Sequence, residues 1–272
     1  MKKLALFLIP LFLLFSSGAI FADMQKTKLA FKNAIHLYSQ EKIRNYMETV
    51  ILSHVMSQEN RAGVPPAETL PVARLKAAQT SGQIITVTTK NLSDFNATLN
   101  AYELQNGVWA ENFVDFPAVG GSRGLMHQRK QNTYTSPVGN WGFVFGFGHM
   151  DNPGLHPDYE YRQTTQDSYW VTDPNSPHYN RWIEGKGDFK EAEHLVQFGA
   201  QYDYALVMDF NYAEPVKGDG AAIFLHIATP DGKGTAGCIA VSKENLLEIM
   251  RWLNPEKNPR IIVCLEGDLE NY

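Results

Sequence analysis

Hydrophobic residues recur at spacings of three and four between residues 25 and 60, with lysine, arginine and glutamate between them. This spacing gathers the apolar side chains on one face and is typical of an amphipathic helix. The stretch "AGVPPAETLP", from Ala62 to Pro71, then interrupts any helix. We therefore predict a helical extension and Pro-rich linker over residues 23–71, followed by a separate domain over residues 72–272.

The pattern changes from Ile84 onward. The runs "QIITVTTK", "ATLNAYELQNGVWAENF" and "YALVMDF" are short and rich in β-branched and aromatic residues, as strands are. The second run contains Asn106-Gly107, the dipeptide most typical of a tight β-hairpin. One late helix is indicated, with Ser242 as its N-cap and Leu246, Ile249 and Leu253 on one face. The predicted fold is mainly β and β-sandwich-like, with a short late helix and the N-terminal helical extension.

Residues 120–182 are rich in glycine, proline and asparagine without regular periodicity, yet they contain many aromatic residues. Disordered segments are poor in aromatic residues, so we expect this region to be ordered. Two interpretations are open: a β-rich core with large turns, or a groove lined for an extended polar substrate.

The chain begins with two lysines, an apolar run and small residues that end at Ala22. This order is typical of a secretory signal peptide, with cleavage expected before Asp23. The alternative is an uncleaved membrane anchor, but the apolar run is shorter than the roughly 20 residues that a spanning helix needs. We therefore predict export to the periplasm, the cell wall or the extracellular space, with no membrane span after cleavage of residues 1–22.

Charge and cysteine content narrow the functional classes. Without residues 1–22 the chain keeps 22 basic and 29 acidic residues, a net charge of −7, which argues against nucleic acid as a partner. Its two cysteines do not form a disulfide framework. Cys264 lies in the apolar run "RIIVCLEG" and is expected to be a buried strand residue, whereas Cys238 lies among small residues in "GTAGCIAV". A disulfide between two such different positions is not expected, although one bridge remains an alternative.

Cys238 and His226 are the candidate catalytic pair. His226 ends the apolar run "AAIFLHI", and the turn-rich segment "ATPDGKGTAG" between them can return the chain to that strand. A thiol needs an imidazole or oriented amides to become an effective nucleophile at neutral pH. Gly237 permits a tight turn whose N–H groups could face an oxyanion, and the Thr235 hydroxyl could orient the site. On spacing alone, a buried structural cysteine and a core histidine explain the residues equally well.

The region "IFLHIATPDGKGTAGCIAVSKENLLEIMRWLNP" resembles the active-site region of the L,D-transpeptidase catalytic domain (YkuD-like) family, in which a histidine and a loop precede Ser/Thr-x-Gly-Cys. "VGGSRGLMHQRKQNTYTSPVGNWGF" and "VTDPNSPHYNRW" are also similar to family segments, so the resemblance runs from about Ile84 to Leu265. It implies that Cys238 forms the acyl-enzyme, that His226 accepts and donates the proton, and that the Gly237 and Cys238 N–H groups bind the oxyanion. Thr235 takes the Ser/Thr position.

The chain departs from the common form of the family at two positions. Ala236 and Ala240 stand where that form has a histidine before the glycine and an arginine two residues after the cysteine. The nucleophile and the base are retained, but the substrate contacts, thiolate stabilisation and donor specificity of the common form do not carry over to this chain. We expect substrate contacts in the matched segments, at Ser122, Arg123, Tyr179 and Asn180.

The resemblance implies an exported cysteine L,D-transpeptidase that acts on peptidoglycan stem peptides, releases D-alanine and transfers the acyl group to an amine. Two alternatives share the fold: an L,D-carboxypeptidase with water as the acceptor, and a wall-binding module without catalysis. A papain-like peptidase fits less well, because such chains place the cysteine before the histidine. The family needs no cofactor and no metal, and "HMDNPGLH" at His149 to His156 has no zinc-motif spacing.

Overall fold

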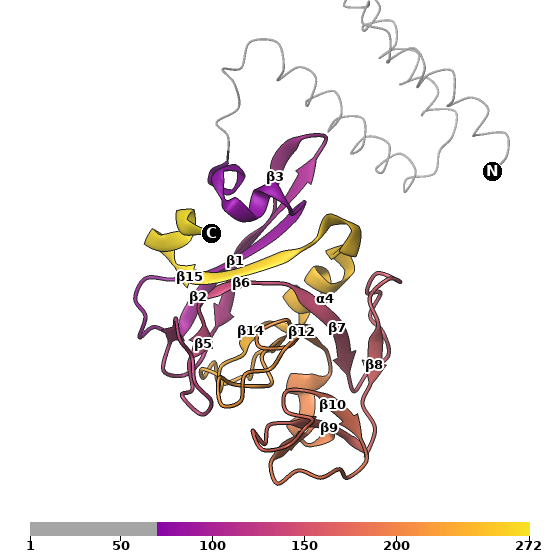
Figure 1. Cartoon of the computed structure of the whole chain (residues 1–272). Coiled ribbons are helices and arrows are strands. Elements are labelled where there is room, and N and C mark those ends of the chain that lie inside the picture. Colours follow the sequence, from indigo (N-terminus) through magenta and orange to yellow (C-terminus); the bar gives the residue numbers. More distant parts are fainter. Residues whose placement is uncertain (1–69) are drawn as a thin grey trace, which may run out of the picture. The chain divides into compact units, whose positions relative to one another are not determined.

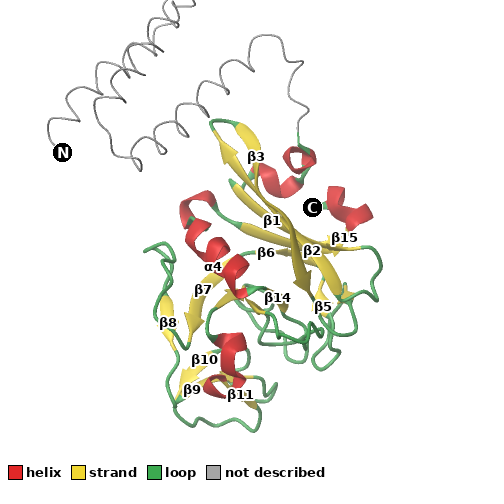
Figure 2. Cartoon of the chain, turned by 180° about the vertical axis from the view of Figure 1, so that it is seen from behind, coloured by secondary structure: helices red, strands yellow, loops and turns green. Residues whose placement is uncertain are grey.

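The computed structural model describes residues 70–272. The predicted signal peptide and amphipathic helix lie outside the described residues, and the domain boundary at residue 71 stays a prediction. The described part begins with two 3-10 helices, η1 (Pro71–Arg74) and η2 (Lys76–Gln79), and another 3-10 helix, η5 (Glu266–Asn271), lies at its end. The C-terminus lies beside η1 and η2 in both views (Figures 1 and 2), where the Ala77 N–H donates to the Tyr272 carbonyl at 2.8 Å.

One large curled sheet dominates the described residues (Figure 1). Its strands, in spatial order, are β6 (Gly139–Trp141), β15 (Arg260–Leu265), β1 (Gln83–Thr89), β2 (Asn96–Gln105), β3 (Val108–Val119), β14 (Ile239–Val241), β13 (Phe224–Ile227), β12 (Ala205–Met208), β7 (Phe143–Gly148) and β8 (Tyr161–Gln163). Within this sheet neighbouring strands are antiparallel except for β1 with β15, β13 with β14, and β7 with β8. The mainly β prediction is confirmed.

The hairpin between β2 and β3 forms where the Asn-Gly signal predicted it. Asn106 and Gly107 both have positive φ, 52° and 80°, as a two-residue hairpin turn with the twist of the flanking strands requires. Gln105 pairs with Val108 across the turn. The turn chemistry therefore sets the register of these two strands.

The main hydrophobic core takes residues from both halves of the curled sheet and from helix α4 (Lys243–Trp252). Every residue of β1 is buried, and Ile84, Leu206 and Leu246 come from β1, β12 and α4. The predicted late helix is confirmed, because the Ser242 hydroxyl accepts from the Asn245 N–H at 3.1 Å and caps α4. Because one curled sheet packs on both sides of this core, its strands have the sequence pattern of a β-sandwich.

A second, aromatic core lies under a small sheet formed by β10 (Trp182–Glu184), β9 (Ser168–Val171) and β11 (Ala192–His194), which is followed by 3-10 helix η3 (Leu195–Tyr202). Figure 1 shows β9 and β10 below the large sheet. Phe147, Trp170 and Phe224 are buried here and pack edge to face. The aromatic middle of the chain thus forms a core, which fits the first of its two interpretations.

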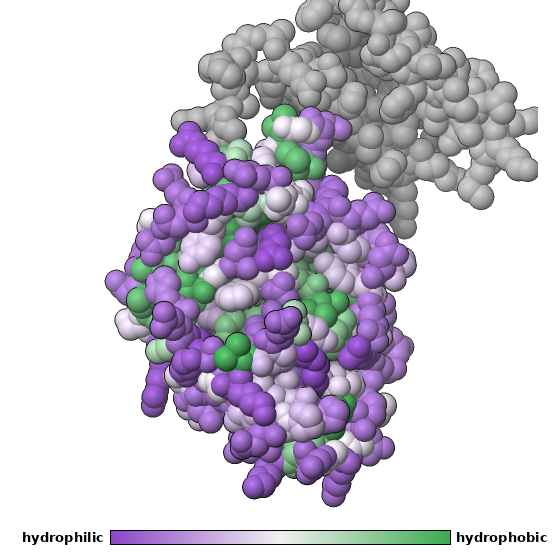
Figure 3. All heavy atoms as spheres, viewed as in Figure 1, coloured by the Kyte–Doolittle hydropathy of each residue, from purple (hydrophilic) through white to green (hydrophobic). Residues whose placement is uncertain are grey.

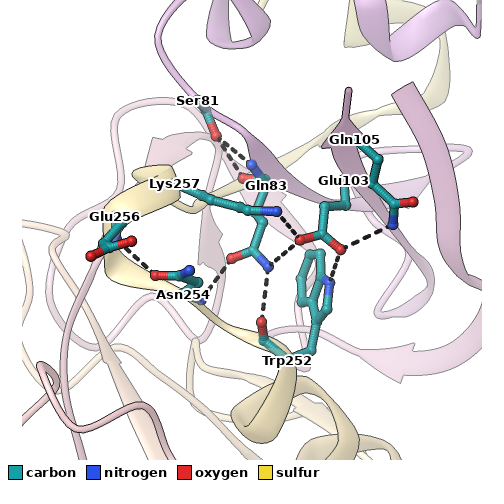
Figure 4. A network of polar contacts seen from close by, with 8 residues as sticks. All are labelled: Ser81, Gln83, Glu103, Gln105, Trp252, Asn254, Glu256 and Lys257. Atoms are coloured by element: carbon teal, nitrogen blue, oxygen red, sulfur yellow. Dashed lines mark hydrogen bonds and ion pairs between the residues drawn. The ribbon is translucent and has the colours of Figure 1, made fainter. Parts of the chain in front are cut away.

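A polar network joins the end of α4 to the start of β1 and the end of β2 (Figure 4). The Glu103 carboxylate on β2 accepts from the Trp252 indole N–H at 3.1 Å and pairs with Lys257, in 3-10 helix η4 (Pro255–Lys257). The buried Gln83 amide donates to the Trp252 carbonyl at 2.9 Å, and its oxygen accepts from the Asn254 N–H at 2.8 Å. Because the buried polar groups in this network are hydrogen-bonded to one another, the network fixes the position of the C-terminal end of α4.

The surface in Figure 3 is mainly hydrophilic, with hydrophobic residues in separate small groups. Large exposed hydrophobic side chains, such as Val108 and Val216, occur far apart in the sequence. Over residues 70–272 the structure contains no helix with the length and apolar character of a membrane span. Cys238 and Cys264 are both free and buried, so the two do not form a disulfide.

Candidate active site

Two neighbouring strands bring the candidate pair together. His226 lies on β13, and Cys238 immediately precedes β14, which pairs with β13 in parallel with Leu225 opposite Ile239. This register places Cys238 level with Phe224, and side chains two residues apart on a strand share a face. Cys238 and Phe224 pack in the same aromatic core, and the Tyr202 ring contacts both Phe224 and His226. The segment between the strands therefore returns the thiol to the face that carries the imidazole.

His226 is held as a neutral proton acceptor. It is 4% exposed, and its Nδ1 lies 2.9 Å from the Ile227 carbonyl oxygen. Because that oxygen only accepts, the ring proton is on Nδ1, and Nε2 keeps its lone pair. Burial lowers the pKa of His226 to about 4. At neutral pH the imidazole is uncharged and in the tautomer that a general base requires.

Cys238 is a protonated thiol in this structure. Its Sγ donates to the Ala222 carbonyl at 3.2 Å and accepts from the Phe224 N–H at 3.4 Å. The residue is 6% exposed. Burial, reinforced by the Glu193 carboxylate, raises the pKa of the thiol to about 12, while the Phe224 N–H and Arg129 act in the opposite direction. The resting pair therefore consists of a thiol and a neutral imidazole.

Thr235 fixes the turn that ends at Cys238. Its hydroxyl donates to the Cys238 carbonyl at 2.7 Å and accepts from the Gly237 N–H at 2.9 Å. Gly237 has φ of +146°, and a Cβ there would lie 2.9 Å from the Thr135 carbonyl oxygen. Glycine is thus required both by conformation and by space. The Gly237 N–H expected to bind an oxyanion is hydrogen-bonded to Thr235 in this state.

The glycine-rich segment that the resemblance singled out lies against the same turn. Ser122 N–H donates to the Thr235 carbonyl at 2.8 Å, and Thr235 N–H donates to the Gly120 carbonyl at 2.8 Å. Ser136, in the short strand β5 (Ser136–Pro137), donates through its hydroxyl to the Cys238 carbonyl at 3.3 Å. Ser122 and Arg123 are exposed beside these contacts. Segments more than 90 residues apart in the sequence therefore support the thiol's turn.

Tyr179 and Asn180, the other expected substrate contacts, are 3% and 2% exposed. The Tyr179 hydroxyl donates to Gln131 at 2.6 Å and accepts from the Gly220 N–H at 3.0 Å. The Asn180 side chain accepts from Trp170 and Ala222 and donates to the Phe210 and Asn211 carbonyls. Both side chains are therefore buried, whereas Ser122 and Arg123 are exposed, and the polar atoms of Tyr179 and Asn180 are hydrogen-bonded within the protein.

Sequence reasoning missed three charged or polar residues near the pair. The Tyr202 ring meets the His226 ring edge to face at 5.5 Å, and its hydroxyl donates to Glu193 at 2.8 Å. Burial raises the pKa of Glu193 to about 7. Arg129, 6% exposed, donates from Nε to the Thr135 carbonyl at 2.7 Å and lies against Gly237. Arg129 lies within the glycine-rich segment that resembles the family, but nothing in the sequence around Arg129, Glu193 or Tyr202 marks them as neighbours of the thiol; the fold brings them there.

Cys264 occupies a different environment. It lies on β15, is fully buried and pairs with Thr88 of β1 in the main core. This agrees with the predicted buried strand sulfur. Over residues 70–272 no three His, Cys, Asp or Glu side chains gather as a metal site would require.

Comparison with known proteins gives a family for this chain. The model of the YkuD family, described as the L,D-transpeptidase catalytic domain, matches residues 96–263. Among solved structures, the chain is similar to the crystal structure of the helical cell shape determining protein Pgp2 from Campylobacter jejuni, with 17% identity and a TM-score of 0.34. That similarity covers 67% of this chain and 47% of the other, about half of its length. No curated protein sequence matches. The family match spans most of the chain and includes the His226 and Cys238 segments, and the chain therefore belongs to the L,D-transpeptidase catalytic domain family.

Proposed function

We propose that this protein is an exported cysteine L,D-transpeptidase that acts on peptidoglycan stem peptides. Membership of the L,D-transpeptidase catalytic domain family supports a role in peptidoglycan metabolism. The observation that carries the specific activity is the parallel pairing of β13 and β14, which turns His226 and Cys238 toward one face. A nucleophile and a base in that relation are the central requirement of acyl transfer through a thioester.

The proposed reaction begins from the neutral pair. His226 Nε2 takes the thiol proton as Cys238 Sγ attacks the carbonyl carbon that the substrate's L-centre contributes to its bond with the terminal D-alanine. The C–N bond breaks, the imidazolium returns the proton to the leaving amine, and D-alanine departs. An amine of a second stem peptide then attacks the thioester, its proton passes to His226, and the thiol is restored.

The hydrogen bond from His226 Nδ1 to the Ile227 carbonyl decides which ring nitrogen transfers the proton. Ile227 holds the Nδ1 proton, so only Nε2 exchanges a proton during the reaction. Burial keeps the imidazole neutral and ready to accept. The same burial keeps the thiol protonated before the proton passes to His226. We therefore assign Cys238 as nucleophile and His226 as general base and acid.

The remaining expected site residues divide by exposure. Thr235 and Gly237 shape the turn, and the Gly237 N–H donates to the Thr235 hydroxyl. Ser122 and Arg123 are exposed beside Thr235 and are our candidates for contact with the carboxylates of the stem peptide. The oxyanion would then rely on main-chain N–H groups at Gly237 and Cys238 once Thr235 has turned away.

Transpeptidation and hydrolysis share the acyl-enzyme and differ only in the acceptor. Incubation of the mature protein with a defined disaccharide-tetrapeptide separates them by mass spectrometry of the products. A crosslinked dimer and free D-alanine support the transpeptidase. A tripeptide without dimer supports the L,D-carboxypeptidase. Neither product from folded protein would contradict both, and cuts at D-isoglutamyl bonds would support a papain-like peptidase.

One observation favours a second candidate function, a wall-binding module without chemistry. Cys238 is 6% exposed and packs with Phe224 in the aromatic core. Sedimentation of the protein with purified sacculi tests this candidate. Binding that persists in Cys238→Ala, with no product formed by the unchanged protein, would establish the module. Turnover that depends on Cys238, with Cys264→Ser as the matched thiol control, supports the enzyme.

Export is part of the proposal. We propose that residues 1–22 are removed, that residues 23–71 connect the mature N-terminus to the catalytic domain, and that the protein acts in the periplasm or cell wall. Mass measurement of the N-terminal peptide from the envelope fraction tests this. A mature chain beginning at Asp23 is expected, whereas an intact Met1 peptide in that fraction would contradict cleavage.

A further inference from the structure

Arg129 is a buried cation beside the candidate nucleophile. It is 6% exposed, and its Nε and Nη2 donate to the carbonyls of Thr135 at 2.7 Å and Ala236 at 3.4 Å. Among the ion pairs of residues 70–272, Arg129 has no carboxylate partner. Buried charges are normally paired, because removing a charge from water is costly.

One nitrogen of this guanidinium has no hydrogen bond within the described part of the chain. Arg129 Nη1 is buried and unpartnered. Buried polar groups in folded proteins nearly always have a partner, so an exception calls for an explanation. The Phe210 ring, 5.8 Å from the guanidinium carbon, covers the group without providing an acceptor. Hydrogen bonds to carbonyl groups account for Nε and Nη2, but they do not account for the burial of Nη1.

The fold makes specific room for this side chain. Cβ atoms added at Gly220 and Gly237 would lie 1.7 Å from Nη1 and 2.8 Å from Nη2. Both glycines have positive φ, +120° and +146°. Gly237 directly precedes Cys238, so the guanidinium lies against the peptide that carries the thiol. The Arg129 guanidinium therefore fills the space that a side chain at either position would need, and this close packing fixes where it lies.

Groups of opposite charge lie close enough to the Cys238 sulfur to act on it. They are the Glu193 carboxylate, which accepts from the Tyr202 hydroxyl, and the Arg129 guanidinium. His226 is the proton acceptor on the neighbouring strand. Arg129 favours the thiolate and Glu193 opposes it, each through its charge.

We propose that Arg129 supplies the fixed positive charge beside which the Cys238 thiolate forms when His226 takes its proton. This rests on the proposed function of Cys238 and His226. Arg129 acts on the sulfur through its charge, and no bond to it forms or breaks. Formation of the thiolate gives the buried guanidinium the anion that the resting structure lacks.

Alkylation of Cys238 by iodoacetamide tests this without any peptidoglycan substrate. The full mature chain carries Cys264→Ser, so that Cys238 is its one thiol, and intact mass gives the rate at each pH. Arg129→Gln is expected to slow alkylation at neutral pH by about tenfold, a one-unit rise in the pKa of the thiol. Arg129→Lys should restore most of the rate. Glu193→Gln should change the rate in the opposite direction.

The controls separate charge from structure. Arg251→Gln is the matched control, because Arg251 Nε also donates to a carbonyl, that of Pro153, at 2.9 Å. Its alkylation profile should equal that of the parent protein. Arg129→Met is the second variant if glutamine prevents folding, since an apolar side chain of similar length fills the space without a charge. It should slow alkylation as glutamine does.

A folded Arg129→Gln or Arg129→Met protein with the parent's pH profile would overturn the proposal. So would an Arg129→Lys protein that reacts as slowly as the uncharged variants, because geometry rather than charge would then be responsible. The assay is independent of crosslinking. Failure of the protein to process stem peptides would refute the proposed function, while the alkylation profiles would still decide the role of Arg129.

Discussion

Replacement of His226 distinguishes a neutral resting pair from a preformed thiolate–imidazolium pair. The pKa values of about 12 for Cys238 and about 4 for His226 place the proton on sulfur. Their difference of about eight units corresponds to about 11 kcal/mol for moving that proton to the imidazole. Even unit charges as close as about 4 Å attract each other by only about 4 kcal/mol at an effective dielectric constant near 20. The neutral pair therefore remains favoured by several kcal/mol.

Two rates should consequently separate in His226→Ala and in the bulkier His226→Gln. Turnover of a stem tetrapeptide is expected to fall about 10²- to 10⁴-fold, because the general base is lost. The iodoacetamide rate of Cys238 at neutral pH should stay within about twofold of the parent in the volume-conserving glutamine variant, since the neutral imidazole does not hold a thiolate. That parent rate should itself be about a thousandfold below the rate of a free thiol with a pKa near 8.5.

The pH dependence of kcat/KM tests the direction in which the pKa of His226 is shifted. Because the pKa of His226 is lowered, the imidazole stays a base as the pH falls, and the acid limb of kcat/KM is expected near pH 4 instead of near pH 6.5. Stopped assays on the tetrapeptide and alkylation followed by intact mass measure both rates. Parallel loss of alkylation and turnover in His226→Gln, or alkylation of the parent with a midpoint near pH 6, would refute this reasoning.

Three further predictions concern other residues. Cys264→Ser should leave turnover nearly unchanged in folded protein; abolished turnover here, with activity kept in Cys238→Ser, would reverse the assignment of the two thiols. Thr235→Val removes hydrogen bonds at 2.7 and 2.9 Å and should cost about 1–3 kcal/mol of unfolding free energy in urea titration and lower kcat, and unchanged kcat would contradict its role in the turn. Burial opposes ionisation of Glu103, but hydrogen bonds from Lys257, Trp252 and Gln105 hold the pKa of Glu103 below its usual range. Glu103→Gln should therefore lower the free energy of unfolding at neutral pH, and this difference from the parent protein should shrink as the pH falls through the lowered pKa. A pH-independent difference in urea midpoints would contradict this account.

Local signals were sufficient for several elements of the fold. Asn106-Gly107 predicted the hairpin between β2 and β3, and Ser242 predicted the start of α4, because turn and capping preferences depend on a few adjacent residues. The apolar run around Cys264 likewise predicted a buried strand. The parallel partner of that strand, β1, lies more than 170 residues earlier, and sequence spacing contains no information on such a pairing.

The candidate site was only partly predictable. The return of Cys238 to the strand that carries His226 followed from the turn-rich segment between them, and β13 and β14 pair accordingly. The aromatic cover that buries the thiol could not be predicted, because it depends on the small sheet formed by β9, β10 and β11. The sequence also showed the loss of the family's arginine at Ala240. Only the fold revealed that Arg129 brings a guanidinium to the turn from another segment.

The most direct test of the central claim is the mass of the protein after incubation with a carbapenem, followed by peptide mapping. An acyl adduct on the peptide that contains Cys238, absent in Cys238→Ala and much slower to form in His226→Ala, is the predicted result. Folded protein that forms no adduct, or an adduct on Cys264 alone, would contradict the assignment of Cys238 as the nucleophile.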